Sequence, residues 1–279
     1  MKKIFDENVK EIVKLALKED APYGDLTTDV LKIEGFGEGY FLAKEDFILC
    51  GIDIAKLVFK TLENKVEVVT KYKDGQFIKR ETKFCFVKGD LKTLLLGERV
   101  ALNFLQRLSA IATKTSNAVK LLSGSRTKIL DTRKTTPLLR ILEKYAVKVG
   151  GGTNHRMGLS DGILIKDNHI EAVGSVTEAV KRARKNCPMK KIEIEVKNIK
   201  EFLDAVKAKA DIILIDNFAP NEIKKALKNK PKEVLVEVSG GVTLDSLPFL
   251  SKLGVDFVSM GALTHTIKAV DISFEIIKK

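Results

Sequence analysis

The sequence of 279 residues has no tryptophan, only three cysteines and no long apolar run. Because no stretch approaches the roughly 18 to 20 apolar residues that span a bilayer, a transmembrane helix is excluded. Charged residues throughout the N-terminal segment, including Asp6 and Glu7, predict that no secretory signal peptide is present. Cys50, Cys85 and Cys187 are odd in number and widely spaced, which argues against a disulfide framework or a zinc cluster. We therefore expect a cytoplasmic protein that does not associate with membranes.

Arginine is also scarce, since only nine of the 49 cationic residues are arginine and the other 40 are lysine. With 37 acidic residues the net charge is +12, which favours an anionic partner such as nucleic acid, a membrane surface or a polyanionic small molecule. Lysine mostly supplies solvated charge, whereas the rigid guanidinium group binds carboxylate or phosphate through two bonds. Aromatic residues make up only 6% of the chain, which argues against a base-stacking surface for nucleic acid.

The first third of the chain predicts a helix, a small sheet and a second helix. Apolar residues from Phe5 to Ala16 recur at helical spacing. From about residue 39 to residue 95, short stretches alternate apolar and polar side chains, which predicts a small and mostly antiparallel sheet. A long helix is expected from about residue 96 to residue 122.

The remainder of the chain repeats a strand-like run followed by a helix-like segment. Seven runs follow this pattern, at residues 127–135, 146–155, 162–169, 191–198, 211–218, 233–241 and 256–265. Repeats of this length fit strand–helix units and a parallel sheet. Because the chain has no GxGxxG sequence, the seven units favour an α/β barrel over an open doubly wound sheet. In such a barrel the loops that follow the strands form the mouth of the active site.

Cationic side chains lie at the polar ends of three successive runs or directly after them: Arg133 and Lys134, then His155 and Arg156, then Lys166. Cations that converge on one mouth repel one another, so they predict an anionic guest, and arginine suits carboxylate or phosphate. The alternative is that these residues form ion pairs on the surface or at an interface.

Two carboxylates, Glu195 and Asp216, lie in consecutive runs, where they could hold sugar hydroxyls, bind Mg²⁺ or stabilise a developing cation. Either could instead be structural.

Small residues lie at the ends of the last two runs, at 239–241 (SGG) and 259–262 (SMGA). Barrels commonly bind phosphate there on backbone N–H groups, although SGG is also a common turn. The chain has no Walker sequence, which disfavours a nucleoside triphosphate site.

Arg107 lies on the predicted long helix among apolar residues, near Val100, Phe104 and Ile111. A cation on an apolar face is costly unless it is paired. We expect either that an internal carboxylate neutralises it or that it reaches a ligand, including one across a subunit interface.

A set of motifs, in this order, resembles the quinolinate phosphoribosyltransferases: DTRKTTP (131–137), GGGTNHRMGLSDGILIKDNH (150–169), EIEVKN (193–198), ILIDN (213–217), VEVSGG (236–241) and SMGALTH (259–265). EDAPYGDLTTD (19–29) and LNFLQRLSAIAT (102–113) match as well, so the resemblance covers nearly the whole chain.

The resemblance implies an open seven-stranded parallel α/β barrel of the TIM-like kind, preceded by an N-terminal α+β open-faced sandwich. The corresponding domains are residues 1–113 for the sandwich, 114–268 for the barrel and 269–279 for a C-terminal helix that returns to the first domain. The resemblance also implies a homodimer in which one subunit's N-terminal domain caps the other's barrel, and it allows a hexamer built as a trimer of dimers.

By this resemblance the enzyme transfers a phosphoribosyl group from 5-phosphoribosyl 1-pyrophosphate to quinolinate with decarboxylation, using Mg²⁺. The products are nicotinate mononucleotide, pyrophosphate and CO₂, in de novo NAD biosynthesis. The residues that would bind quinolinate are Arg133, His155, Arg156 and Lys166, together with Arg107 entering the neighbouring subunit's site. The residues that would bind the phosphoribosyl 5-phosphate are Ser239, Gly240, Gly241, Met260, Gly261 and Ala262. The residues implied to be catalytic are Lys134, between the two substrates, and Glu195 and Asp216, which would contact the ribose and help to place Mg²⁺, directly or indirectly.

Related activities stay open at this point. A nicotinate phosphoribosyltransferase, or the related protein found alongside molybdate transport, shares the superfamily, and DAPYGDLTT suits the latter about as well. TRKTTP and HRMGLSDGILIKDNH, with Lys166 intact, favour quinolinate. A non-catalytic phosphosugar-binding barrel should have lost charged mouth residues, and none of the matched ones is missing. An RNA-binding protein would use the +12 charge, and its affinity would fall steeply with salt.

Overall fold

The computed structural model describes residues 7–277, which form two compact units. Within the described chain, the first unit comprises the residues up to Ser116, Thr136–Gly151 and the residues from Thr266 onward. The second unit comprises Asn117–Thr135 and Gly152–His265. Phe5, which the sequence pattern places on the first helix, lies outside the described residues. Among residues 7–277, no helix combines the length and the apolar character needed to cross a membrane.

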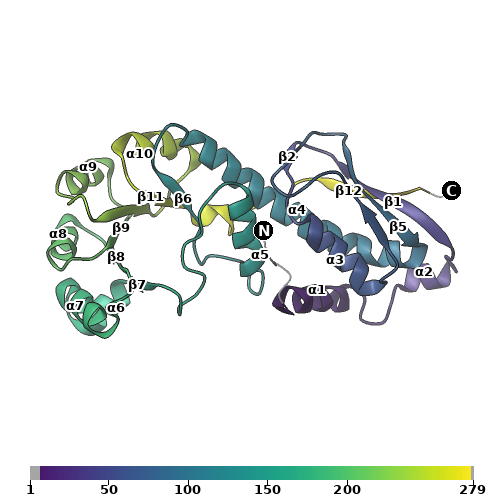
Figure 1. Ribbon diagram of the computed structural model, residues 1–279, viewed down its shortest axis with the longest axis horizontal. Helices are drawn as coiled ribbons and strands as arrows, with labels where there is room; N and C mark the ends of the chain where they lie inside the picture. Colours follow the sequence, from purple (N-terminus) through teal and green to yellow (C-terminus); the bar gives the residue numbers. More distant parts are fainter. Residues whose placement is uncertain (1–6, 278–279) are drawn as a thin grey trace. The chain divides into compact units, whose positions relative to one another are not determined.

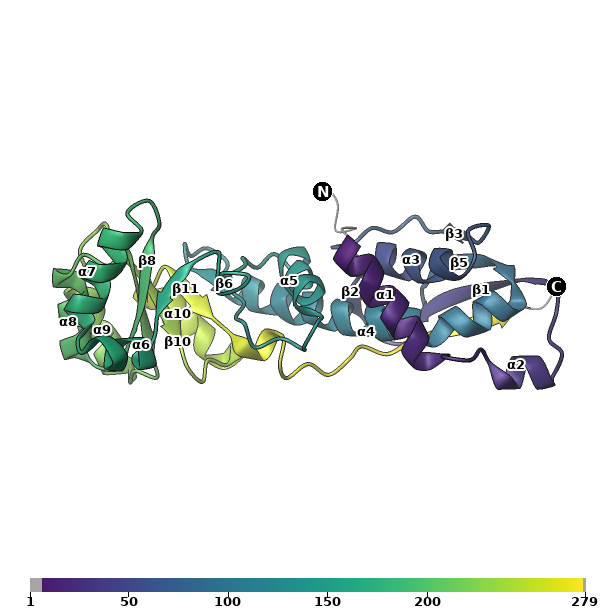
Figure 2. The same ribbon diagram turned by 90° about the horizontal axis from the view of Figure 1, so that it is seen from below.

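The first unit contains a four-stranded antiparallel sheet, a short two-stranded sheet and five helices within the described residues (Figure 1). The helices are α1 (Glu7–Asp20), α2 (Leu26–Val30), α3 (Ile52–Leu62), α4 (Leu91–Leu121, assigned to the second unit from Asn117) and α5 (Arg140–Val149). The strands are β1 (Phe36–Ala43), β2 (Phe47–Ile48), β3 (Glu67–Val69), β4 (Phe77–Ile78), β5 (Lys83–Asp90) and β12 (Ile272–Ile277). The larger sheet has the order β12-β1-β5-β3, and β2 pairs with β4. Helices α1 and α3 lie side by side (Figure 2).

Buried phenylalanines join α3 to the larger sheet. The ring of Phe41 on β1 lies 4.8 Å from that of Phe274 on β12 and 5.9 Å from that of Phe84 on β5. Phe59 on α3 lies 6.3 Å from Phe41, ring to ring. The sequence pattern predicted the antiparallel strands of this region but not α3, whose buried face repeats at helical spacing.

The C-terminal segment is a strand, so the helix predicted for residues 269–279 is wrong. Strand β12 pairs antiparallel with β1, with Phe274 opposite Phe41. Buried Ile272 and Phe274 alternate with the more exposed Ser273 and Glu275, which is the period of a half-buried strand and not of a helix. A Cβ on Gly39 of β1 would lie 2.3 Å from the ring of Phe274, so this glycine leaves the space that the ring fills.

The second unit is built on a parallel sheet with helices on its outer face (Figure 1). Its strands are β6 (Lys128–Leu130), β7 (Ile163–Ile165), β8 (Ile192–Val196), β9 (Ile212–Asp216), β10 (Leu235–Ser239) and β11 (Phe257–Ser259). Its helices are α6 (Asp167–Val173), α7 (Val176–Asn186), α8 (Ile199–Lys207), α9 (Pro220–Lys228), α10 (Leu247–Leu253) and the 3₁₀ turns η1 (Leu244–Ser246) and η2 (Gly261–Leu263). The strand order is β6-β11-β10-β9-β8-β7, and all pairs are parallel. The predicted α/β class with a parallel sheet is confirmed.

One of the seven predicted strands is absent from this sheet. The run at residues 146–155 begins inside α5, where Leu142, Ala146 and Val147 are buried. Only Thr153 pairs as a strand would, in an isolated parallel bridge with Leu130. Strands β6 and β7 end the order without pairing to each other in the described chain, so the sheet is open and has six strands. Because residues 136–151 belong to the first unit, the predicted boundary at residue 113 also differs from the observed division.

A buried ion pair joins α4 to α5 in the first unit. The guanidinium of Arg107 donates through Nε and Nη2 to Oε1 of Glu143, at 2.7 and 2.6 Å. Nη2 also donates to the hydroxyl of Thr136 at 2.6 Å, and the backbone N–H of Thr136 donates to Oε2 of Glu143. The side chain of Glu143 is fully buried. An internal carboxylate therefore neutralises Arg107 on its apolar helix face, as one of the two sequence alternatives predicted.

We predict that Arg107→Met destabilises the protein by about 3–5 kcal/mol at neutral pH, because it leaves the Glu143 carboxylate buried without a cation. Urea unfolding would measure this loss, and Arg107→Met/Glu143→Leu should recover much of it. Arg80→Met, at an exposed arginine that pairs with its neighbour Glu81, is the matched control and should change little. If Arg107→Met were as stable as Arg80→Met, the result would contradict the proposed strength of the Arg107–Glu143 pair.

Candidate active site

The inward face of the parallel sheet carries polar side chains. Successive residues of a strand point to opposite faces, and residues in register on neighbouring parallel strands share a face. On β8 and β10 the outward positions are apolar and buried, as at Ile194 and Val236, whereas the inward positions hold Glu195 and Glu237. Leu214 of β9 is in register with both of these glutamates. One face of the sheet therefore packs against the helices, and the other face presents charged side chains.

A cavity of about 670 Å³ opens at the carboxyl ends of these strands. Its volume lies in the range of small-molecule sites. Thirteen of the fourteen predicted site residues line it: Arg133, Lys134, His155, Arg156, Lys166, Glu195, Asp216, Ser239, Gly240, Gly241, Met260, Gly261 and Ala262. They come from all the strands of the sheet or the loops that follow them, as the strand-end argument predicts. Glu237, Ser259 and His265 line the cavity as well.

Arg133 and Arg156 place two positive charges near each other at the cavity. Burial lowers the pKa of Arg156, and the nearby charge of Arg133 lowers it further, while Glu193 and Asp161 act in the opposite direction. Nη1 of Arg156 donates to the carbonyl of Gly162, but its Nε is buried and finds no hydrogen-bond partner in residues 7–277. A buried guanidinium donor without a partner, next to a second positive charge, is suited to an anion.

Two carboxylates, the buried Asp131 and the exposed Asp161, hold the loop that carries Arg156. Asp131, which is completely buried at the end of β6, accepts hydrogen bonds from the side chain of Asn154 and the backbone N–H of His155. Asp161 accepts from the backbone N–H groups of Met157 and Gly158. Because both ends of the loop are fixed in this way, Arg156 is held in place despite the repulsion.

Lys166 directly follows β7 and forms an ion pair with Glu195, with 2.6 Å between Nζ and Oε2. The backbone N–H of Lys166 donates to Nδ1 of His169, which caps the start of α6. This capping bond gives His169, whose role the sequence left open, a structural function. Lys166 and Glu195 together place a cation and a carboxylate side by side on the cavity wall.

The glycine-rich loops after β10 and β11 form the remaining wall. Gly240 has φ +85°, and a Cβ there would lie 2.3 Å from Oδ1 of Asn217, so only glycine fits. A Cβ on Gly261 would lie 3.0 Å from the side chains of both Lys134 and His265. The loop after β11 is tied to that after β6, since the hydroxyl of Thr264 donates to the carbonyl of Lys134. The open backbone of these loops is suited to a phosphate.

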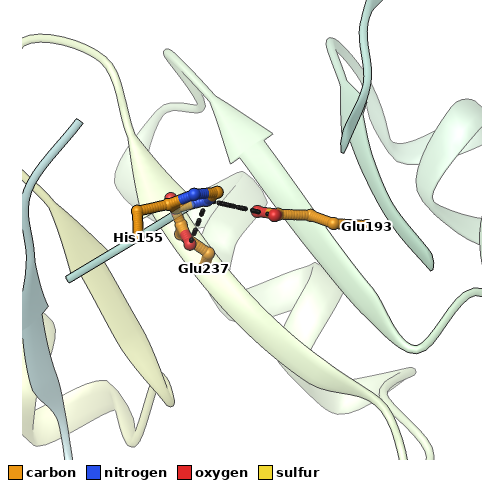
Figure 3. A group of neighbouring side chains, drawn as sticks. All are labelled: His155, Glu193 and Glu237. Atoms are coloured by element: carbon orange, nitrogen blue, oxygen red, sulfur yellow. Dashed lines mark hydrogen bonds and ion pairs between the residues drawn. The ribbon is translucent and has the colours of Figure 1, made fainter. Parts of the chain in front are cut away.

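Sequence reasoning missed a largely buried cluster of His155, Glu193 and Glu237 (Figure 3), of which His155 and Glu237 line the cavity. Nε2 of His155 lies 3.0 Å from one oxygen of Glu193 and 3.6 Å from one oxygen of Glu237. Burial, and secondly the charge of Glu193, raise the pKa of Glu237 to about 8. The available signal was the alternation IEIEV at 192–196, because a strand buried on both faces should be apolar at every position.

Arg107 is the predicted site residue that does not line the cavity. It belongs to the first unit, where it binds Glu143. Its predicted entry into a neighbouring subunit's site stays a prediction.

Comparison with protein families matches the two parts of the chain separately. The model described as the quinolinate phosphoribosyl transferase N-terminal domain matches residues 25–109. The model described as the C-terminal domain of the same family matches residues 111–275. Together the two matches cover nearly all of the chain, as the motif resemblance did.

Individual relatives agree with the family match. The chain is 44% identical to the probable nicotinate-nucleotide pyrophosphorylase (carboxylating) of Bacillus subtilis, over 96% of this chain and 93% of that protein. It is 43% identical to the protein of the same description from Methanocaldococcus jannaschii, over 96% and 97% of the two chains. The solved structure of the nicotinate-nucleotide pyrophosphorylase from Francisella tularensis superposes with a TM-score of 0.94 at 40% identity, over 99% and 98% of the two chains. These matches confirm the resemblance, and the chain belongs to the quinolinate phosphoribosyltransferase family.

Proposed function

We propose that this chain transfers the phosphoribosyl group of 5-phosphoribosyl 1-pyrophosphate to quinolinate with decarboxylation, giving nicotinate mononucleotide, pyrophosphate and CO₂ in de novo NAD biosynthesis. The observation that supports this most directly is the buried, unsatisfied Nε of Arg156 beside the charge of Arg133. A guest with carboxylates relieves both the unmet donor and the repulsion. The family membership and the names of the relatives support the same assignment.

The cationic side of the cavity suits the two carboxylates of quinolinate. We assign them to Arg133, Arg156 and Lys166, with His155 below. Lys166 already shares its charge with Glu195, whereas Arg133 forms no ion pair within the described chain. Arg133 therefore supplies positive charge that no carboxylate of the described chain pairs with.

The small-residue loops suit the sugar phosphate. Ser239, Gly240 and Gly241 follow β10, and the 3₁₀ turn η2 begins at Gly261 after Met260. Both loops line the cavity, and their three glycines carry no side chain that would keep a phosphate from the backbone. Lys134 contacts Gly261 and so lies between the phosphate side and the cationic side, as expected of a residue that touches both substrates.

The residues fit the Mg²⁺ that the family implies. Glu195 and Asp216, on the neighbouring strands β8 and β9, offer the hard carboxylate oxygens that this ion prefers. We propose that these two residues hold it, directly or through water. Bound Mg²⁺ would neutralise the charge of the pyrophosphate group.

The side chains then act through position and charge. The pyridine nitrogen attacks the anomeric carbon as the bond to pyrophosphate breaks, and the carboxylates of Glu195 and Asp216 favour the positive charge that develops on the sugar. The product ring is a pyridinium. It accepts the electron pair of the adjacent C–CO₂⁻ bond, CO₂ leaves, and a proton then takes the place of the carboxyl group on that carbon. Holding both substrates in one cavity supplies much of the acceleration.

The first prediction for this function concerns substrate choice. Purified protein with Mg²⁺ and phosphoribosyl pyrophosphate should release CO₂ from quinolinate in step with pyrophosphate, and chelation of Mg²⁺ should abolish the reaction. Nicotinate, which lacks the second carboxylate, should be a poor substrate. Preference for nicotinate, or no CO₂ from quinolinate, would contradict the proposal and favour a related phosphoribosyltransferase or a non-catalytic barrel.

The second prediction concerns Arg133. Arg133→Ala should lower kcat/KM for quinolinate by roughly a hundred- to several-thousand-fold, because a carboxylate left unpaired in a desolvated site costs about 3–5 kcal/mol. Arg182→Ala, which removes an exposed arginine of α7 in the same unit, is the matched control and should stay near wild type. A loss below tenfold in Arg133→Ala would remove this residue from the pocket.

The third prediction concerns assembly. We propose a homodimer with shared active sites, in which Arg107 acts in the neighbouring subunit's site, with a hexamer as a trimer of dimers as a further assembly. Arg107→Ala and Lys134→Ala should each inactivate the enzyme, and mixed dimers of the two should recover activity because one of the two sites is then intact. Mixed dimers that are isolated with two different tags and remain inactive would contradict sharing.

A further inference from the structure

The two carboxylates that line the cavity at the ends of β8 and β9 are held by different kinds of partner. Glu195 forms an ion pair with Lys166. The carboxylate of Asp216 forms no ion pair within residues 7–277, and it accepts one hydrogen bond there, from the side-chain amide of Asn217 at 2.8 Å. A neutral donor orients a carboxylate without cancelling its charge, whereas a cation does both. The negative charge of Asp216 is therefore left to the cavity that it lines.

Asn217 turns the chain at the end of β9 in a left-handed conformation. Its φ is +56°, in a region that asparagine enters more readily than most residues with a side chain. Its backbone N–H donates to the carbonyl of Ser239 on β10 at 3.1 Å. Because Asp216 and Ser239 are paired in register, this bond continues the pairing of β9 with β10 one residue beyond the end of β9. The backbone of Asn217 is thus fixed to the strand that precedes the glycine-rich loop.

The side chain of Asn217 also packs against the loop that we assign to the 5-phosphate. A Cβ on Gly240 would lie 2.3 Å from Oδ1 and 2.5 Å from Cγ of Asn217, so the amide fills the space beside this glycine. An ionised carboxylate can only accept, so the amide nitrogen faces Asp216 and the amide oxygen faces the loop. One side chain therefore contacts both the carboxylate and the first glycine of the loop.

We propose that Asn217 is a positioning residue that fixes the carboxylate of Asp216 relative to the phosphate-binding loop at 239–241. It acts through Asp216 and Gly240, which line the cavity, and it is not itself among the described residues that do. The charge of Asp216 then lies at a set distance from a sugar whose phosphate the loop holds. The catalytic part of this inference rests on the proposed function, in which Asp216 stabilises the positive charge that develops on the sugar.

The kinetic test removes the amide without straining the backbone, since glycine adopts a positive φ freely. Asn217→Gly should lower kcat by about ten- to a hundredfold, because a misplaced carboxylate stabilises the transition state less well. The KM for phosphoribosyl pyrophosphate should rise, because Gly240 loses its support. The KM for quinolinate, which the cationic wall binds, should stay within about twofold of wild type.

Lys209→Gly is the matched control and should follow wild type, because Lys209 is also left-handed, with φ +62°, but lies just before β9 and not after it. A kcat of Asn217→Gly close to that of this control would overturn the proposal. An equal rise of both KM values with kcat unchanged would overturn it as well, because it would show a general loosening of the cavity.

A second variant separates hydrogen-bond donation from packing. Asn217→Asp keeps the size of the side chain and tolerates a positive φ, but an ionised carboxylate cannot donate to Asp216. It should lower kcat at least as far as Asn217→Gly does. A wild-type kcat in Asn217→Asp would show that the donor is not needed and would overturn the proposal.

Crystal structures of both variants without substrate supply a readout that does not depend on the reaction. The carboxylate of Asp216 should leave its position in each, and in Asn217→Gly the loop at 239–241 should shift, while the pair of Lys166 and Glu195 stays in place. An unchanged carboxylate of Asp216 would overturn the proposal. A displaced carboxylate in a protein that does not use quinolinate would support the positioning by Asn217 and contradict only the proposed function.

Discussion

The repulsion between Arg133 and Arg156 is the interaction on which the cavity depends. Two guanidinium groups this close, one of them partly buried, would separate if their backbone were free. The fold prevents this because Asp131 and Asp161 bind backbone N–H groups on both sides of Arg156, and Asp131 is itself buried at a strand end. These hydrogen bonds therefore keep Arg156 near Arg133 before an anion binds. Preorganisation of this kind lowers the cost of binding, since no loop has to be ordered when the ligand enters.

The parallel sheet divides the chemistry of the cavity by strand. Cations follow β6 and β7 and the loop between them, carboxylates end β8 and β9, and small residues follow β10 and β11. This order places carboxylates between the cationic wall and the phosphate wall. In the proposed substrate complex the sugar lies between the quinolinate carboxylates and the 5-phosphate. Its anomeric carbon becomes positive during the reaction, so carboxylates at this middle position stabilise it. In the proposed reaction the two walls bind the substrates, and the carboxylates of the strands between them stabilise the positive charge that develops.

The sequence predicted much of this site because strand ends are local features. Thirteen site residues could be placed at one mouth from their positions after apolar runs, with no knowledge of strand order. The prediction was wrong where a pattern permits two structures. The run at 146–155 contains apolar residues that suit either a strand or the last turns of α5, and tertiary packing in the first unit decides for the helix. The C-terminal residues were assigned to a helix by family resemblance, although the alternation of Ile272 and Phe274 with polar neighbours indicates a strand.

Arg107 shows a different limit. Its apolar helix face indicated correctly that it needs a partner, but the partner, Glu143, lies on another helix at a sequence distance that no local pattern encodes. A long-range pair of this kind follows only from the packing of α4 against α5.

The buried glutamates extend the same logic below the mouth. Because a strand alternates with period two, each inward residue at the mouth has an inward residue two positions earlier: Glu195 has Glu193, and Ser239 has Glu237. The outer residue of each pair lines the cavity wall near the strand end, and the inner one lies deeper against His155. A deep polar layer is costly, and an apolar layer would fill the same volume at a lower free energy. This layer places the carboxylates of Glu193 and Glu237 against Nε2 of His155, and His155 itself lines the cavity.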